Sequence, residues 1–185
     1  MKELEKRGYR EFIRRLEGGV RYCRVMTEED RADSAIGRGW KGTFKAETRK
    51  EAEDGLRKRS YDWEWIKAKS SDGVEEEDEW LLKEITPVLD AIRVNANGEK
   101  VFFNQIVAAW NGWRDKYNSP KDCVRFADGT PLDEDVMKVA SDLLDECSVA
   151  FRWEKGDILL IDNTSVMHAR RSFKGKRKVL ASLAK

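Results

Sequence analysis

The sequence predicts an α+β protein, because helical and strand-like patterns occupy different stretches of one 185-residue chain. Apolar side chains recur at helical spacing in two long stretches, residues 4–17 and 133–147. Between them lie short segments in which apolar and polar residues alternate, or apolar residues run together, as is typical of strands. The length suffices for one domain with a substantial core, and no repeat or linker pattern interrupts it. We therefore expect one domain over residues 1–185.

The first part of the chain is predicted to contain two helices and two strands. Leu4–Glu17 places Tyr9 and other apolar residues on one helical face, and the glycines that follow end that helix. Val20–Met26 is the first predicted strand, and residues 48–58 form the second helix. Tyr61–Trp65 alternates aromatic with acidic residues, which predicts a half-buried strand.

Three stretches in this part invite a ligand-binding interpretation that their surroundings do not favour. The glycine-rich run Gly37–Phe44 lacks the phosphate-loop pattern Gly-x-x-x-x-Gly-Lys-Ser/Thr. The aromatic residues of 61–65 could stack on nucleic-acid bases, but their flanks are not basic. The acidic run Glu75–Glu79 has no other type of metal ligand near it, so we interpret it as part of a solvated loop.

The second part is predicted to hold a β-hairpin followed by two helices. Ile85–Val94 and Lys100–Phe103 form the hairpin strands around the turn at Asn95–Glu99. Asn104–Tyr117 has apolar residues at helical spacing and predicts a helix packed on the sheet. The remaining predicted elements are a short strand at 124–126, a turn at 128–129, the helix at 133–147 begun by Thr130 or Asp133, and a strand at 149–153.

Composition excludes several classes of partner. The formal net charge of +1 gives no general attraction to nucleic acid or to an anionic membrane. No apolar run approaches the roughly 20 residues that span a bilayer, and the charged start Met1–Glu5 is not a secretory signal. The three widely spaced cysteines favour reduced thiols and lack metal-ligand spacing. We expect an intracellular, cytoplasmic protein that binds neither nucleic acid nor membrane.

The most informative stretch begins at Trp153. The turn Lys155–Asp157 precedes the apolar run Ile158–Ile161, which predicts a strand buried on both faces. Asp162 and Asn163 can then bend the chain through side-chain-to-backbone hydrogen bonds, ahead of His168, the only histidine. A lone histidine is most often a hydrogen-bonded core or surface residue, and the alternative is a ligand or general base held by a rigid strand.

This stretch carries a long, specific resemblance. It reads Trp-x-x-Gly-Asp-Ile-Leu-Leu-Ile-Asp-Asn-x-x-Val-Met-His-Ala-Arg-Arg-x-Phe from Trp153 and closes with Arg-Lys-Val-Leu-Ala-Ser-Leu from Arg177. The pattern resembles the carboxy-terminal signature of the TauD/TfdA-like (taurine dioxygenase, clavaminate synthase-like) oxygenases, and in particular their plant branch. That branch also has a Gly-Arg-Gly-Trp-Lys-x-Thr-Phe segment like the one at residues 37–44.

The resemblance implies a double-stranded β-helix (jelly roll) with flanking helices, and an Fe(II)- and 2-oxoglutarate-dependent oxidoreductase that hydroxylates a small organic substrate. In such enzymes two histidines and one carboxylate hold the iron. His168 matches the late histidine, whereas the early His-x-Asp or His-x-Glu motif has no counterpart. The resemblance therefore implies an amino-terminally truncated member with an incomplete jelly roll, in which one imidazole cannot hold Fe(II) alone.

The resemblance also implies which residues surround the iron. Arg177 is the best match to the arginine that binds the 2-oxoglutarate carboxylate, and Arg170 and Arg171 could contribute instead. The alternative for all three arginines is an exposed basic surface. Asn104, which follows a Phe-Phe pair, and Asn163 are candidates for positions next to the metal ligands.

Three functions are compatible with this sequence. The first is the dioxygenase activity itself. The second is a catalytically inactive remnant that acts as a binding or interaction module. The third, nucleic-acid binding through arginine-rich and aromatic segments, is disfavoured by the nearly neutral charge. A truncated chain would also lack partner strands, so we expect exposed sheet edges and self-association through them.

Overall fold

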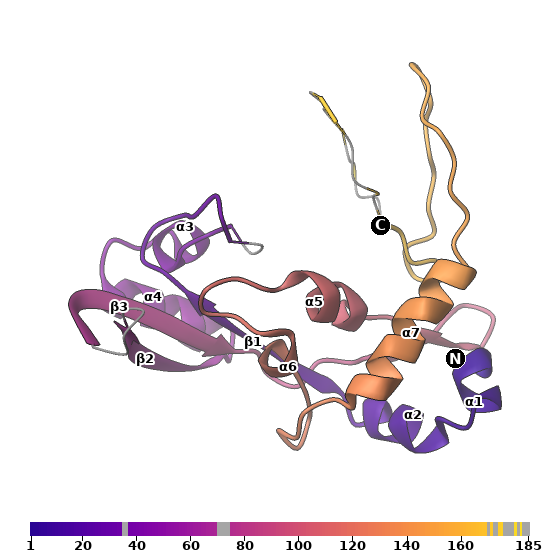
Figure 1. Cartoon of the computed structure of the whole chain (residues 1–185), viewed down its shortest axis with the longest axis horizontal. Helices are drawn as coiled ribbons and strands as arrows, with labels where there is room; N and C mark the ends of the chain where they lie inside the picture. The colour runs from indigo at the N-terminus through magenta and orange to yellow at the C-terminus, as the bar shows by residue number, and fades with distance from the viewer. Residues whose placement is uncertain are drawn as a thin grey trace.

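The computed structural model describes residues 1–34, 37–69, 75–169, 171, 174–175, 180 and 182, with residue 69 and residues 75–79 described by their backbone alone. The molecule is elongated, with α1, α2 and α7 gathered at one end and α3 and α4 lying against β2 and β3 at the other (Figure 1). None of the helices in the described ranges is long and apolar enough to cross a membrane.

A four-stranded sheet in the order β2–β3–β1–β6 forms the frame. All its neighbouring strands are antiparallel, with Trp65 of β2 opposite Leu82 of β3 and Tyr22 of β1 opposite Val124 of β6. A separate pair, β4 and β5, makes the predicted hairpin, with Ile92 opposite Phe102. The strands are β1 (Val20–Met26), β2 (Asp62–Lys69), β3 (Glu75–Ile85), β4 (Ile92–Val94), β5 (Lys100–Phe102) and β6 (Val124–Phe126).

Helices α4 and α7 start at side-chain caps that the sequence supplies. Thr48 and Glu51 form a capping box at the start of α4, and Asp133 accepts hydrogen bonds from the first backbone N–H groups of α7. The predicted first helix is broken into α1 and α2, because Gly8 adopts φ of 92° between them. The helices are α1 (Lys2–Lys6), α2 (Arg10–Glu17), α3 (Trp40–Phe44), α4 (Arg49–Lys58), α5 (Ile106–Gly112), α6 (Pro120–Cys123) and α7 (Glu134–Glu146).

The interior contains two main apolar clusters that share strand β1. Val20, at the start of β1, is fully buried among residues of α2, α5, α7 and β6. Met26, at its end, is buried with Leu82 of β3 and Leu56 of α4. Between them Arg24 of β1 forms an ion pair with Glu84 of β3, whose carboxylate is buried. A buried carboxylate needs such a partner, because desolvation of an unpaired charge is costly.

Asn118 extends the sheet where β6 ends. Strand β6 pairs with β1 no further than Tyr22, and beyond that point the Asn118 amide takes its place. Val25 N–H donates to Asn118 Oδ1 over 2.7 Å, and Asn118 Nδ2 donates to the Val25 carbonyl over 2.9 Å. Asn118 is 8% exposed and Val25 is half-buried, so these bonds satisfy backbone groups that no neighbouring strand reaches.

Three sequence-based predictions for residues 75–117 differ from the structure. The acidic run Glu75–Glu79 lies within β3 and not in a loop, because the antiparallel pairing with β2 continues to Glu75. The predicted strand 85–94 is interrupted between Ile85 and Ile92, where Pro87 cannot donate a ladder hydrogen bond. The predicted helix 104–117 is limited to α5, and α6 follows it as a separate short helix.

We expect Asn118→Ala to lower the free energy of unfolding by about 1–3 kcal/mol, since it removes two hydrogen bonds to the N–H and C=O of the half-buried Val25. Urea denaturation followed by circular dichroism measures the loss. Asn111→Ala is the matched control, because Asn111 is exposed and bonds to the Ser141 hydroxyl. Equal losses in the two variants would contradict the role given to Asn118.

The three cysteines are free thiols in unlike surroundings, with Cys23 and Cys123 buried and Cys147 exposed. Burial raises the pKa of the Cys123 thiol to about 11, and that of Cys23 is raised for the same reason. A disulfide reagent at pH 8 should therefore label one thiol rapidly in the native protein and three in denaturant. Cys147→Ser should abolish the rapid phase, and a rapid phase that persists would contradict this placement.

Candidate functional site

Residues 148–167, here called the arm, leave the end of α7 and project from the body as two limbs (Figure 1). A turn joins the limbs where predicted: Gly156 adopts φ of 100°, and Glu154 N–H donates to the Asp157 carboxylate over 2.7 Å. The predicted bend at Asp162 is also present, because its carboxylate accepts hydrogen bonds from Thr164 N–H and the Thr164 hydroxyl. The sequence therefore specifies both turns of the arm.

The two limbs of the arm do not form the predicted strands. Residues 149–153 and 158–161 have no strand structure, and the prediction of a strand buried on both faces is wrong for this chain. Ile158 and Leu160 are 95% and 96% exposed, and Val149 is 90% exposed. An apolar run becomes a buried strand only when other layers cover both of its faces, and no such layer lies over the arm in the described ranges.

The predicted metal ligand and the residues predicted to lie next to it do not converge. His168, which follows the arm, is exposed, as are Asn163 on the bend and Arg171. Asn104 lies at the start of α5, where its amide donates to the Ala91 carbonyl over 2.8 Å and accepts from Ile106 N–H over 2.9 Å. Within the described part of the chain, no hydrogen bond or ion pair links His168 to Asn104, Asn163 or Arg171. Arg170 and Arg177 lie outside the described residues.

The side chains available as metal ligands decide whether this chain can hold iron. A three-ligand Fe(II) site needs two imidazoles and a carboxylate on one face, with further positions open. The chain has a single histidine, and the described residues contain no group of three or more His, Cys, Asp or Glu side chains placed to hold a metal ion. The described residues therefore do not fit a complete iron site, and His168 supplies at most one ligand.

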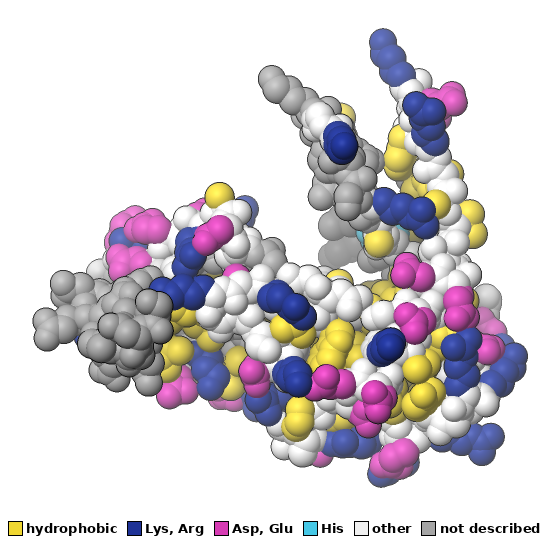
Figure 2. Space-filling model, in the orientation of Figure 1, with side chains coloured by type: hydrophobic (Ala, Val, Ile, Leu, Met, Phe, Trp, Pro, Cys, Tyr) yellow, Lys and Arg dark blue, Asp and Glu magenta, His cyan; other side chains and the backbone are white. Residues whose placement is uncertain are grey.

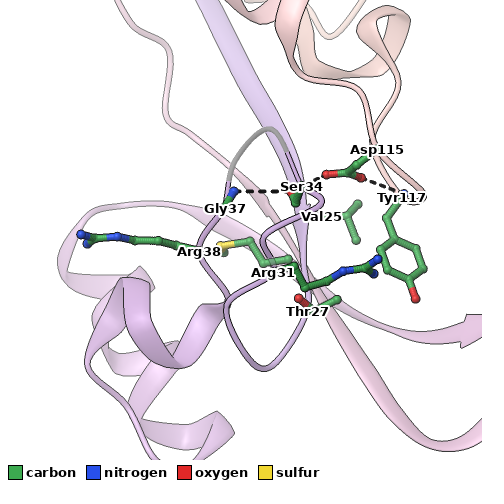
Figure 3. A pocket seen from close by; sticks show the side chains of 9 residues that line it. Val25, Thr27, Arg31, Ser34, Gly37, Arg38, Asp115 and Tyr117 are labelled. Carbon is green, nitrogen blue, oxygen red and sulfur yellow. Dashed lines mark hydrogen bonds between the residues drawn. The ribbon is translucent and has the colours of Figure 1, made fainter. Parts of the chain in front are cut away.

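A polar cluster that the sequence did not predict lies beside the end of β1 (Figure 3). Asp115 accepts hydrogen bonds from the Ser34 hydroxyl over 2.6 Å and from Tyr117 N–H over 2.9 Å. Arg31 lies 5.5 Å from the centre of the Tyr117 ring, whereas Arg38 extends away from the cluster. The hollow between these groups is about 10 Å³, which is room for roughly one water. The cluster therefore fastens the loop after β1 to the segment after α5 and is too small for a substrate.

The electrostatics of this cluster support a structural role. Burial raises the pKa of Asp115, but the hydrogen bonds from Ser34, Asn118 and backbone N–H groups outweigh it and hold the pKa below its ordinary value of 3.8. The only sequence signal was local: Asp115 precedes Tyr117 and Asn118 at the spacing of an Asx turn. That signal identifies the turn but not the distant partner Ser34.

A wider, open hollow lies between α5, α6 and the start of α7. Its volume is about 330 Å³, which falls at the lower end of small-molecule pockets. Trp110, Arg114 and Ser119 line it, and Lys121 and Glu134 form an ion pair at its edge. It contains no histidine or cysteine, so it offers a surface for contact but no metal site.

Comparison with known proteins decides the family. The sequence profile of the taurine catabolism dioxygenase TauD, TfdA family matches residues 47–183, which is more than half of the chain. The chain belongs to the TauD/TfdA family. The match includes His168 and the three candidate arginines, so the resemblance seen in the sequence is confirmed.

A relative shows how much of such a protein this chain contains. The chain is 40% identical to a clavaminate synthase-like protein of Arabidopsis thaliana over an alignment of 185 residues, which covers 99% of this chain and 53% of the relative. It therefore spans about half the length of that relative. The α+β class agrees with the mixed helices and antiparallel sheets, whereas the jelly roll remains a prediction.

We expect the stability contributed by Asp115 to depend on pH. Because its pKa is lowered in the folded state, this contribution is present above about pH 4 and is lost as the pH falls below 3.8. Asp115→Asn should lower the free energy of unfolding by roughly 1–3 kcal/mol at pH 6, and the difference from the parent should shrink towards pH 3. Urea denaturation across this range measures it, and a difference that does not change with pH would contradict the assignment.

Proposed function

We propose that this chain is the His168-bearing part of an Fe(II)- and 2-oxoglutarate-dependent dioxygenase that hydroxylates a small organic substrate. The observation that carries the proposal is the family match over residues 47–183, which spans the late histidine and the candidate arginines. In this proposal residues 1–185 belong to one TauD/TfdA-like domain, of which they form the later part.

Each candidate residue has a defined role in this proposal. His168 is one imidazole ligand, and the other two ligands come from outside these 185 residues, because the chain has no second histidine and therefore no His-x-Asp or His-x-Glu motif. Arg177 binds the carboxylate of 2-oxoglutarate, with Arg170 and Arg171 as alternatives, because a guanidinium fork matches a carboxylate in geometry and charge. When bound, Fe(II) would supply the oxygen chemistry. The described residues do not complete its site, so no catalytic step is assigned to this chain alone.

The small number of metal-binding side chains also supports a second candidate function. A chain with one imidazole and no cluster of three metal-binding side chains in its described ranges lacks what the reaction requires. In that case the chain is a catalytically inactive member of the family, and the exposed arm serves binding or interaction.

A chimera separates the two functions. In it this chain replaces the matching region of the Arabidopsis relative, and the readouts are bound iron per molecule and succinate formed from 2-oxoglutarate. The dioxygenase proposal predicts about one iron per molecule and succinate formation, with both lost in His168→Ala, because removal of a ligand costs coordination and geometry. A folded chimera without iron or succinate would favour the inactive member, and turnover by the chain alone would contradict the ligand count.

The same chimera distinguishes the arginines. Replacement of the arginine that binds the co-substrate should raise the KM for 2-oxoglutarate roughly 10- to 100-fold, since a charged hydrogen-bonded pair is lost. We expect this effect from Arg177→Ala and not from Arg170→Ala or Arg171→Ala. KM values equal to that of the parent in all three variants would show that these arginines form only a basic surface.

A further inference from the structure

An asparagine is followed by a glycine at two places in the chain, at residues 97–98 and at residues 111–112. In such a pair the backbone nitrogen of the glycine can attack the side-chain amide carbon of the asparagine and close a succinimide ring. Glycine permits this approach because it has no Cβ and adopts many backbone conformations. Ring closure requires the backbone to change its dihedral angles, so the surroundings of each pair decide how fast it reacts.

The first pair lies on the turn between β4 and β5, where Asn97 and Gly98 are both exposed. The turn itself requires glycine, because φ of Gly98 is 77°, and a Cβ at this position would meet no atom within 4 Å. Within the described part of the chain, the Asn97 side chain makes no hydrogen bond. Gly98 N–H donates to the Asn95 carbonyl over 3.0 Å, and this bond has to open before the nitrogen can attack.

Opening this turn disturbs little of the fold. Strands β4 and β5 have three residues each and form a two-stranded sheet separate from the four-stranded one. Short two-stranded hairpins are only marginally stable by themselves, and their exposed turns open at low free-energy cost. Asn97 therefore reaches reactive backbone conformations while the rest of the protein stays folded.

The second pair is held more firmly, although Asn111 is also exposed. Asn111 lies in the last turn of α5, and its amide donates to the Ser141 hydroxyl of α7 over 3.1 Å. A helical side chain leans towards the amino terminus of its helix, away from the backbone nitrogen of the next residue. Since Ile106 and Val107 bury α5 in the core, ring closure at Asn111 requires a packed helix to unwind.

We propose that Asn97 is a site of spontaneous deamidation in the folded protein and that the structure protects Asn111. The Gly98 nitrogen forms a bond to the side-chain carbon of Asn97 and gives up its proton. The bond from that carbon to the amide nitrogen breaks, and ammonia leaves. Water then opens the ring at either of its carbonyl groups, which yields aspartate or isoaspartate at this position. Water is the only co-reactant, and no atom is oxidised or reduced.

The product differs from the parent turn in charge and in backbone length. A carboxylate replaces a neutral amide, so the formal net charge falls from +1 to 0. Acidic and basic side chains are interspersed over the face of the body seen in Figure 2, so the added charge acts through its nearest neighbours. Glu99 of the same turn forms an ion pair with Lys2 over 3.2 Å, and a second carboxylate nearby competes for that lysine. Isoaspartate also lengthens the main chain, which misaligns the bond from Asn95 N–H to the Glu99 carbonyl.

The test incubates the full native chain at pH 8 and follows both asparagines by mass spectrometry of tryptic peptides. Cleavage after Arg93, Lys100 and Arg114 separates the two pairs into residues 94–100 and 101–114. Conversion at Asn97 should be roughly 10-fold faster than at Asn111, or more, because the two positions differ in the cost of local opening. In guanidinium chloride, where both segments are unfolded, the two rates should become similar.

Matched variants show which residue produces the acidic form of the protein in isoelectric focusing. Asn97→Gln should abolish that form, because the longer side chain would have to close a larger ring and reacts far more slowly. Asn111→Gln is the control and should leave it unchanged, and both side chains are exposed, so these variants should fold as the parent does. Equal native rates at the two asparagines, or an acidic form that persists in Asn97→Gln, would overturn the assignment.

Discussion

The arrangement of this chain depends on one strand that is packed differently at its two ends. Val20 of β1 lies in the cluster built by α2, α5, α7 and β6, and Met26 lies in the cluster beneath α3 and α4. Neither cluster is complete without its share of β1. Between these ends, Arg24 forms an ion pair with the buried carboxylate of Glu84. The Asn118 amide bonds to Val25 where no neighbouring strand does.

The arm differs from β1, because its apolar side chains are exposed. Its apolar residues have the same composition as a core strand, but the chain around them provides no covering layer in the described ranges. An apolar segment is buried only when a second surface covers it. An apolar run therefore indicates that a covering surface is needed, but it does not provide one. The chain belongs to the TauD/TfdA family and spans about half the length of one relative.

What the sequence predicted well was local. Strand β1, the capped helices α4 and α7, and the turns at Gly98, Gly156 and Asp162 depend on patterns within a few residues, and all are present. The acidic part of β3 was missed because its pairing with β2, and not its own composition, makes it a strand. The extent of α5 was overestimated because helical spacing continues into a segment where Asp115 and Asn118 form a turn.

The candidate site depends on family resemblance and not on local sequence patterns. His168 and the three arginines were singled out through family resemblance, and the described structure neither joins them to a metal site nor places Arg170 and Arg177. The cluster around Asp115 was not predicted, because its members Arg31, Ser34 and Asp115 come from segments about 80 residues apart. No periodicity or motif relates such positions.

The shared strand also links the two halves of the molecule during folding. Side chains alternate between the faces of a strand, so a slip of β1 by one residue against β3 would turn Met26 away from Leu82. The same slip would also move Val20 out of its place in the cluster of α2, α5, α7 and β6, since all residues of a strand shift together. The two clusters therefore share a single alignment, and an error in either is transmitted to the other, which favours cooperative formation of the whole sheet.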